Sequence, residues 1–271
     1  MSAPETAAPM AAPAGNPNWT AFRTIIRREV ARIVRIWGQT LVPPAITMTL
    51  YFLIFGKLIG SKIGDMGGFS YMDFIVPGLV MMSVIQNAYG NISSSFFGAK
   101  FGRHIEELLV APLPNWVILG GYVGGAVLRG FMVGAIVLAV AMLFTKVRVH
   151  DWAVTVSTVL LGAVIFSLAG FVNAVYAKKF DDIAIIPTFI LTPLTYLGGV
   201  FYSVKLLPDW AEAATHANPI FYMVNAFRYG LLGTGATDVP LWSAYAVMLG
   251  AVVALTWLGL WLLQRGVGLR S

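Results

Sequence analysis

Six long apolar stretches follow one another along this chain. Each is close to the roughly 20 residues that a helix needs to cross the hydrocarbon core of a bilayer. The acidic side chains lie between the stretches or at their edges, and one base, Arg129, lies near the middle of a stretch. The pattern predicts an all-helical integral membrane protein with six transmembrane helices. The predicted crossings cover about residues 40–60, 74–97, 116–144, 152–176, 183–203 and 241–263.

Prolines mark two of these crossings. Pro43 and Pro44 are expected in the first turn of the first crossing, where a missing backbone N–H group costs little. Pro187 and Pro193 interrupt the fifth crossing, so a kink or a break in the helix is expected there.

A helix with two different faces is predicted over residues 19–37, before the first crossing. It is suited to lying flat in the membrane interface, and packing on protein is the alternative. Residues 1–18 are rich in Ala and Pro and lack the pattern of a signal peptide, so we expect a disordered cytosolic tail. The apolar face of the helix holds Phe22, Ile26, Val30, Ile33 and Trp37, and the other face holds Arg23, Arg27, Arg28, Arg32 and Arg35.

Composition and charge support the membrane assignment. The chain is 58% hydrophobic and 11% charged, whereas soluble domains are ~25% charged. Its formal charge of +6 comes from bases beside the apolar stretches, which indicates membrane orientation rather than nucleic-acid binding. With six crossings, both termini and two of the loops lie on the same side of the membrane. The segments on that side hold 11 of the 18 Lys and Arg residues, so both termini are expected in the cytosol. There is no cysteine, which excludes disulfides and thiolate chemistry.

The cytosolic segment 98–114, between the second and third crossings, contains a short amphipathic pattern. Its apolar members are spaced for one face of a helix over 103–110, with the two glutamates pointing elsewhere. Such an apolar ridge either docks in a groove of another protein or rests on lipid headgroups, and the pattern alone favours neither. The residues concerned are Arg103, His104, Ile105, Glu106, Glu107, Leu108 and Leu109.

The outer segment 205–235 precedes the last crossing and carries distinctive motifs. Asn218 and Pro219 predict a helix start, with Asn as the cap and Pro at the first helical position. The apolar run Ile220–Phe227 is too short to cross a bilayer, so two short helices dipping in from the outer face are expected. Arg228 is expected at the end of the second helix, where a cation suits the helix dipole.

Three motifs of this segment resemble the signature of ABC-2 type transporter permeases. They are Leu207-Pro-x-Trp210, Asn218-Pro219-x-x-Tyr222 and Ala226-Phe-Arg228-Tyr-Gly230. Further similar stretches are 39–44, 105–112 and 191–203, and the resemblance covers nearly the whole chain from about residue 20.

The resemblance implies a fold and an assembly. Residues 19–37 would be the connecting helix, 38–271 the ABC-2 type transmembrane domain, and 103–110 a coupling helix seated in a cleft of an ATPase. The outer helices would form a re-entrant pair. Two copies of the chain would form a homodimer in the bacterial inner membrane and bind two separate ATPase subunits, which would hold the ATP and Mg. The complex would export an amphipathic or lipid-like cargo.

Polar residues inside the crossings mark a possible translocation path. An Arg at mid-membrane, such as Arg129, costs roughly 2.5–3.5 kcal/mol on insertion scales. It either attracts an anionic headgroup or is satisfied structurally. Gln86, Asn87 and Asn91 recur at close to helical spacing in the second crossing, where they line either a conduit or a helix–helix contact.

Several kinds of chemistry find no residues in this sequence. No Walker A pattern appears, so the chain is not expected to hydrolyse ATP or to bind a cofactor directly. The three histidines lie in separate loops without metal-ligand spacing, and no catalytic cluster is evident. An ATP-independent secondary carrier or channel is the alternative to an ABC permease. A lipid-modifying membrane enzyme would require an acid–base or metal-binding cluster.

Overall fold

The computed structural model describes residues 16–268, apart from the side chain of Leu109. Within this range the chain forms a bundle of helices and one small β-hairpin, Asp65–Met66 (β1) with Phe69–Ser70 (β2). The predicted disordered tail over 1–18 lies outside the described residues up to residue 15, and it is wrong for Pro17 and Asn18, which belong to the first helix. The helices are α1 (Pro17–Arg35), α2 (Trp37–Tyr51), the π-helix η1 (Phe52–Ile59), α3 (Gly60–Ile63), α4 (Tyr71–Phe101), α5 (His104–Val110), α6 (Asn115–Ala141), α7 (Trp152–Tyr176), α8 (Asp182–Ile186), the π-helix η2 (Pro187–Leu191), α9 (Thr192–Tyr196), the 3₁₀ helix η3 (Val204–Leu206), α10 (Asp209–His216), α11 (Pro219–Leu232), the 3₁₀ helix η4 (Thr234–Ala236) and α12 (Leu241–Arg265).

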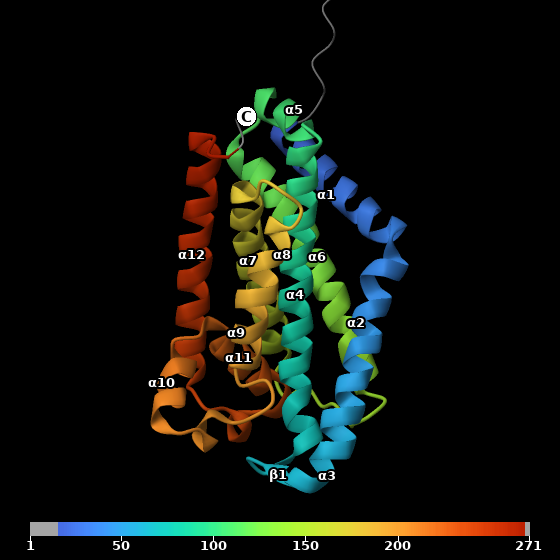
Figure 1. Ribbon diagram of the computed structural model, residues 1–271, viewed down its shortest axis with the longest axis vertical. Coiled ribbons are helices and arrows are strands. Elements are labelled where there is room, and N and C mark those ends of the chain that lie inside the picture. Colours follow the sequence, from blue (N-terminus) through green and yellow to red (C-terminus); the bar gives the residue numbers. More distant parts are fainter. Residues whose placement is uncertain (1–15, 269–271) are drawn as a thin grey trace, which may run out of the picture.

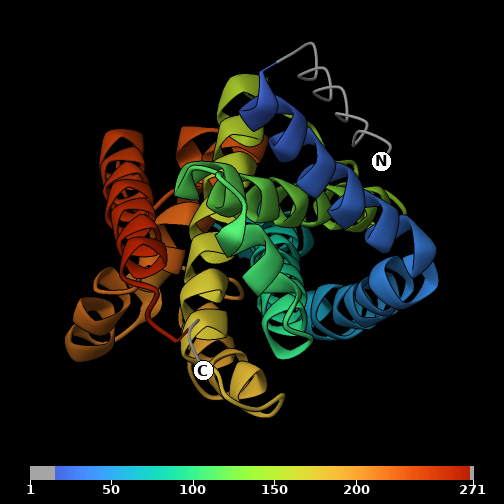
Figure 2. The same ribbon diagram turned by 90° about the horizontal axis from the view of Figure 1, so that it is seen from above.

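The long helices run back and forth between two ends of the bundle (Figure 1). The α5 end holds α5 and the C-terminal end of α12. The hairpin end holds β1, β2, α3 and α10 (Figure 1). Seen along the long axis, α1 lies across the outside of the bundle at the α5 end (Figure 2). The segments predicted to be cytosolic and those predicted to be outside therefore lie at opposite ends.

Four segments are both long and apolar enough to cross a membrane: Trp37–Ile63, α6, α7 and α12. The longest helix, α4, is not among them, because its Ser, Gln, Asn and Tyr side chains lower its hydropathy. It instead lies centrally, with most of its side chains buried against α6, α7 and α11. The all-α fold is therefore confirmed, whereas six crossings remain a prediction.

The fifth predicted crossing is shorter than expected. Its helical part ends at Tyr196, so the prediction that it reaches residue 203 is wrong. Pro187 does disturb the helix, because it starts the π-helical turn η2, but no break occurs: α8, η2 and α9 continue one another over Asp182–Tyr196. The carbonyl of Pro187 accepts both the backbone N–H and the hydroxyl (2.8 Å) of Thr192, which closes the wider π-helical turn. Gly199, with φ of +72°, lies in the turn that follows.

The first crossing starts earlier than predicted. Since α1 ends at Arg35 and α2 begins at Trp37, Trp37 lies outside the amphipathic helix and is exposed. Pro43 and Pro44 consequently lie well inside α2, not in its first turn. Proline has no N–H group to donate to the carbonyl four residues earlier, so two backbone carbonyls of α2 lose their helical partners.

The amphipathic helix α1 packs on protein along one face, which was the alternative given for it. Phe22, Ile25 and Ile26 lie directly against glycines of α6: Gly120, Gly121 and Gly124. Glycine pairs one helical turn apart let two helices approach closely, as small residues do at helix contacts in membranes. Ile25 and Ile33 are buried there, whereas Arg23, Arg27 and Arg35 remain exposed.

We predict that Gly121→Val destabilises the α1–α6 contact. A Cβ atom at this position would lie 2.7 Å from Ile25 Cγ2, and overpacking of this kind costs about 1–3 kcal/mol. The thermal unfolding midpoint in detergent should fall by about 2–4 °C per kcal/mol. Gly250→Val is the matched control, because a Cβ at Gly250 meets nothing within 4 Å. Equal midpoints for the two variants would contradict the proposed close approach.

Candidate functional site

A polar cavity of about 270 Å³ lies between α2, α4 and α6. Two of the elements around it are helices with the length and apolarity of membrane crossings, so its polar lining is unusual. The two α2 carbonyls freed by Pro43 and Pro44 belong to Gln39 and Thr40, which also line the cavity. The full lining is Gln39, Thr40, Pro43, Pro44, Thr47, Met48, Ser83, Gln86, Asn87 and Arg129.

Arg129 is the charged residue of this cavity. Its Nη1 donates to Asn91 Oδ1 and its Nη2 to Asn87 Oδ1, both at the long distance of 3.4 Å. Its buried Nε has no hydrogen-bond partner, and no carboxylate of residues 16–268 lies within 4 Å of the guanidinium. Arg129, Gln86, Asn87 and Asn91, predicted together from the sequence, therefore do lie together.

A buried acid ties α1 to this cavity. Glu29 of α1 is 1% exposed. It accepts hydrogen bonds from Ser95 of α4 (2.5 Å) and from Arg32 (2.9 Å). Arg32 in turn donates to Asn91 Oδ1 (2.8 Å), the same oxygen that Arg129 approaches. We call Glu29, Arg32, Asn91, Ser95 and Arg129 the Asn91 cluster; it holds two guanidinium groups and one carboxylate.

Sequence reasoning missed Glu29. The helical wheel separated an apolar face from an arginine face, and Glu29 was assigned to neither. Its spacing was nevertheless informative, because it lies three residues after Ile26 and four before Ile33, on the apolar face. An acid at such a position has to find a partner when the face is buried.

The short helix α5 is oriented differently from the prediction. Ile105 is 1% exposed and packs into the bundle. Leu108 is half-buried against the same apolar core. The prediction of an exposed apolar ridge is therefore wrong for Ile105 and Leu108, which anchor α5 to its own bundle; the side chain of Leu109 lies outside the described part of the chain. The exposed face instead carries His104, Glu106 and Glu107, with Val110 at the end.

The turn before α5 is strained. Arg103 has φ of +58°, and it is the only non-glycine residue with positive φ in the described part of the chain. A left-handed conformation costs an L-residue of order 1–3 kcal/mol and persists where the surroundings enforce it. The Gly102–Arg103 turn directs the chain from the end of α4 into α5.

Polar contacts fasten the chain around α5. Lys100 donates to the carbonyls of Val175 (2.6 Å) and Ala177 (2.8 Å), which closes the end of α7. The carboxylate of Asp182 accepts the backbone N–H groups of Lys178 and Lys179, and these bonds hold its pKa below the usual range. A cavity of about 490 Å³ opens between these residues and α5.

The outer motif residues fix two short helices in place. Asn218 caps α11 as predicted, accepting from Ile220 N (3.0 Å), and its Nδ2 donates to the carbonyl of Leu194 (2.6 Å). Pro219 is the first residue of α11, as predicted. The Tyr222 hydroxyl donates to the carbonyl of His216 (3.0 Å), which holds α10 against α11.

Arg228 does not lie at the helix end. Since α11 continues to Leu232, Arg228 lies inside the helix, and the dipole explanation given for it is wrong. The residue is fully buried. Its Nη2 donates to the carbonyl of Gly199 (2.7 Å), and its guanidinium stacks 3.8 Å from the ring centre of Phe74. It therefore joins α11 to α4 and to the turn after α9.

The family model for ABC-2 type transporters matches residues 20–232. The chain belongs to the ABC-2 type transporter family. The match confirms the resemblance seen in the motifs and makes the chain a membrane component of a transporter.

Individual relatives support the same assignment over most of their length. The chain is 60% identical to the inner membrane transport permease YadH of Escherichia coli K12, over 93% of this chain and 98% of that protein. It is 25% identical to nodulation protein J of Rhizobium leguminosarum bv. trifolii, covering 84% of this chain and 87% of the relative. The corresponding protein of Sinorhizobium fredii is 28% identical over the same shares.

We predict that Glu29→Gln destabilises this ABC-2 protein. Without the carboxylate, Arg32 and Arg129 share one amide oxygen with no opposite charge nearby. Breaking a fully buried pair costs about 3–5 kcal/mol. Because the Arg32 side chain is 31% exposed, we expect about 1–3 kcal/mol after solvent screening.

The Glu29→Gln/Arg32→Gln double variant should recover part of this loss, because both partners of the ion pair are then neutral. Thermal unfolding in detergent measures both effects, and Glu106→Gln provides the same chemical change on an exposed glutamate. A stability loss in the double variant equal to or larger than the sum of the two single losses would contradict the pairing.

Proposed function

We propose that the chain is the permease subunit of an ATP-binding cassette exporter in the bacterial inner membrane. The family match, the inner-membrane name of the E. coli relative and the missing Walker A motif support this role. Two copies would form a homodimer and bind two ATPase subunits, on which ATP and Mg are held. Both termini and α5 would face the cytosol, with six crossings and the α10–α11 pair as a re-entrant element.

The observation that carries the proposal is the anchoring of α5. Its apolar side, with Ile105 and Leu108, is fixed to the bundle, while its charged side is free for a partner. A force on the exposed face would therefore reach α4 through the side chains that pack between the two helices. Arg103 forms the turn between α4 and α5, and Lys100 joins the end of α4 to the end of α7.

The polar side of α4 supports a path through the membrane. Gln86, Gly90 and Ser94 follow at intervals of four residues, so they share one face of the helix. Gln86 is half-buried, and Gly90 and Ser94 are exposed. In a bilayer, such a polar face has to meet a conduit or a second protein surface.

The Asn91 cluster supports an anionic, amphipathic cargo. Arg129 has two long hydrogen bonds and an unpartnered Nε, so its guanidinium is only weakly satisfied. A phosphate or carboxylate entering the cavity would supply short, charge-assisted hydrogen bonds that the protein itself does not provide. We propose that Arg129 attracts the headgroup of the cargo, with Gln86, Asn87 and Asn91 lining its path.

Purification and reconstitution test the proposed role directly. An ATPase should co-purify with the permease from its native membrane, and proteoliposomes of the complex should move labelled lipid only when ATP is supplied. Uphill transport by the permease alone would instead establish a secondary carrier. Ion flux that only follows the ion's own gradient would indicate a channel.

We predict that Glu106→Lys/Glu107→Lys uncouples the ATPase. The two exposed side chains lie on the face proposed to dock on the ATPase. Charge reversal should weaken this docking by about 1.4 kcal/mol and thereby lower ATP-driven transport about 10-fold. The unfolding midpoint should stay unchanged, because both side chains are exposed.

The charge-matched control is Asp209→Lys/Glu212→Lys on α10, at the opposite end of the bundle. It should leave ATP-driven transport intact. Ile105→Ala should differ from both by lowering stability, because it removes a buried side chain. Unchanged transport in the Glu106→Lys/Glu107→Lys variant would exclude this face as the docking surface.

We predict that Arg129→Gln selectively impairs anionic cargo. Transport of labelled phosphatidylglycerol by the complex should fall about 10-fold, whereas transport of labelled phosphatidylcholine should change little. Arg129→Lys keeps the charge without the bidentate geometry and should give an intermediate rate. Arg23→Gln removes one exposed arginine of α1 as the control. Equal loss for both lipids would assign Arg129 a structural role.

A further inference from the structure

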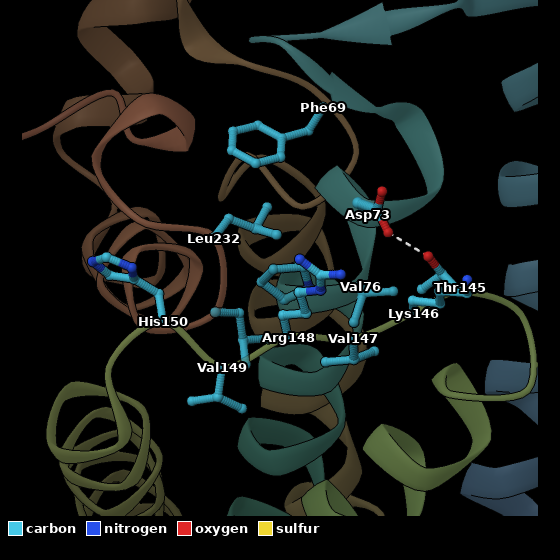
Figure 3. A pocket seen from close by; sticks show the side chains of 12 residues that line it. Phe69, Asp73, Val76, Thr145, Lys146, Val147, Arg148, Val149, His150 and Leu232 are labelled. Carbon is cyan, nitrogen blue, oxygen red and sulfur yellow. Dashed lines mark hydrogen bonds between the residues drawn. The ribbon is translucent and has the colours of Figure 1, made fainter.

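A second cavity, distinct from that of Arg129, opens at the hairpin end of the bundle (Figure 3). Its volume is about 600 Å³, within the range of small-molecule binding sites, which is about 300–1,000 Å³. Three elements surround it: the start of α4 with Phe69, the segment 145–150 between α6 and α7, and the end of α11.

Basic side chains enter this cavity from a single segment. Along 146–150, exposed and half-buried residues alternate: Val147 and Val149 pack on the core, while Lys146, Arg148 and His150 are exposed. In Figure 3 the Arg148 side chain extends between His150 on one side and Asp73 on the other. Within residues 16–268, no carboxylate lies within 4 Å of Lys146 or Arg148.

The one acid in the lining, Asp73, is already engaged by hydroxyl groups. Its Oδ1 accepts a hydrogen bond from Thr145 (dashed line in Figure 3), and its Oδ2 accepts one from Ser70 (2.6 Å). Its backbone N–H bonds to Ser70 as part of the cap of α4. The side chains left without a partner in the cavity are therefore the cations.

The walls of the cavity are held by interactions between elements that are distant in sequence. The Asp151 N–H donates to the carbonyl of Gly230 in α11 (2.8 Å). The His150 ring packs edge-on against Tyr229, with ring centres 5.7 Å apart. These contacts fix the basic segment relative to α11, so the cavity is formed by the fold itself.

The rest of the lining is apolar. Val76 and Pro77 of α4, Leu231 and Leu232 of α11, and the ring of Phe69 contribute to it. A ligand that fits both parts carries a negative group for Arg148 and Lys146 and an apolar body for these side chains. Arg binds phosphate and carboxylate groups through two parallel hydrogen bonds.

We propose that this cavity binds an amphipathic anion, a phosphate or carboxylate group joined to an apolar body. This proposal does not depend on the proposed ATP-driven transport. Ligand binding at equilibrium, measured without nucleotide, tests it. Its lining segments lie at the end of the bundle opposite α5, the end that the charge pattern assigns to the outside of the membrane.

The full-length protein in phosphatidylcholine nanodiscs should bind dioctanoyl phosphatidylglycerol, as measured by titration calorimetry. Arg148→Gln should weaken this binding at least 10-fold. Lys62→Gln, which removes an exposed charge at the same end but outside the cavity, should change it less than twofold. Unchanged affinity in Arg148→Gln, with an unchanged unfolding midpoint, would overturn the site.

Further measurements test the electrostatics of the lining and the ligand's need for both a negative group and an apolar body. Asp73→Asn removes the negative charge of the lining and should tighten phosphatidylglycerol binding about threefold, whereas weaker or equal binding would contradict the assigned electrostatics. Dioctanoyl phosphatidylcholine should bind at least 10-fold more weakly than phosphatidylglycerol. Inorganic phosphate binding as tightly as phosphatidylglycerol would overturn the amphipathic character and leave a free-anion site.

Discussion

The energetic cost of charge inside a membrane governs how the middle of this bundle is built. Hydrocarbon offers no hydrogen-bond partner, so polar groups there have to satisfy one another. The amide oxygen of Asn91 receives a guanidinium from α1 and one from α6, and Glu29 supplies the single balancing carboxylate. Three elements that are far apart in sequence are thereby held at one point. The central helix α4 can be less apolar than its neighbours because α6, α7 and α11 shield most of it from lipid.

Much of the fold could be predicted from the sequence, because apolar length and proline position act locally. The bounds of α7 agree with the predicted crossing 152–176, and α11 begins at Pro219, directly after the predicted cap Asn218. The shortened fifth crossing also has a local cause, since Pro187 and Pro193 exclude a regular helix, although its end at Tyr196 depends on the turn that follows.

The candidate site could be predicted only in part, because it depends on which face of each element meets the bundle. Periodicity placed the apolar side chains of α5 on one face but could not show that this face turns inward, as the burial of Ile105 does. Likewise, Arg129 and the amides of α4 were found as polar exceptions within apolar runs. Glu29 was not, since its partner Ser95, and the Asn91 amide that Arg32 joins to it, reach α1 only through tertiary packing.

The prolines of α2 have a mechanical consequence. A regular helix resists bending because each change of axis strains its backbone hydrogen bonds, but at Pro43 and Pro44 those bonds are already missing. The two halves of α2 can therefore change their mutual angle at this level without breaking a further bond. Since the Gln39–Thr47 stretch forms one wall of the Arg129 cavity, such bending would widen or narrow the cavity while the rest of the helix stays intact.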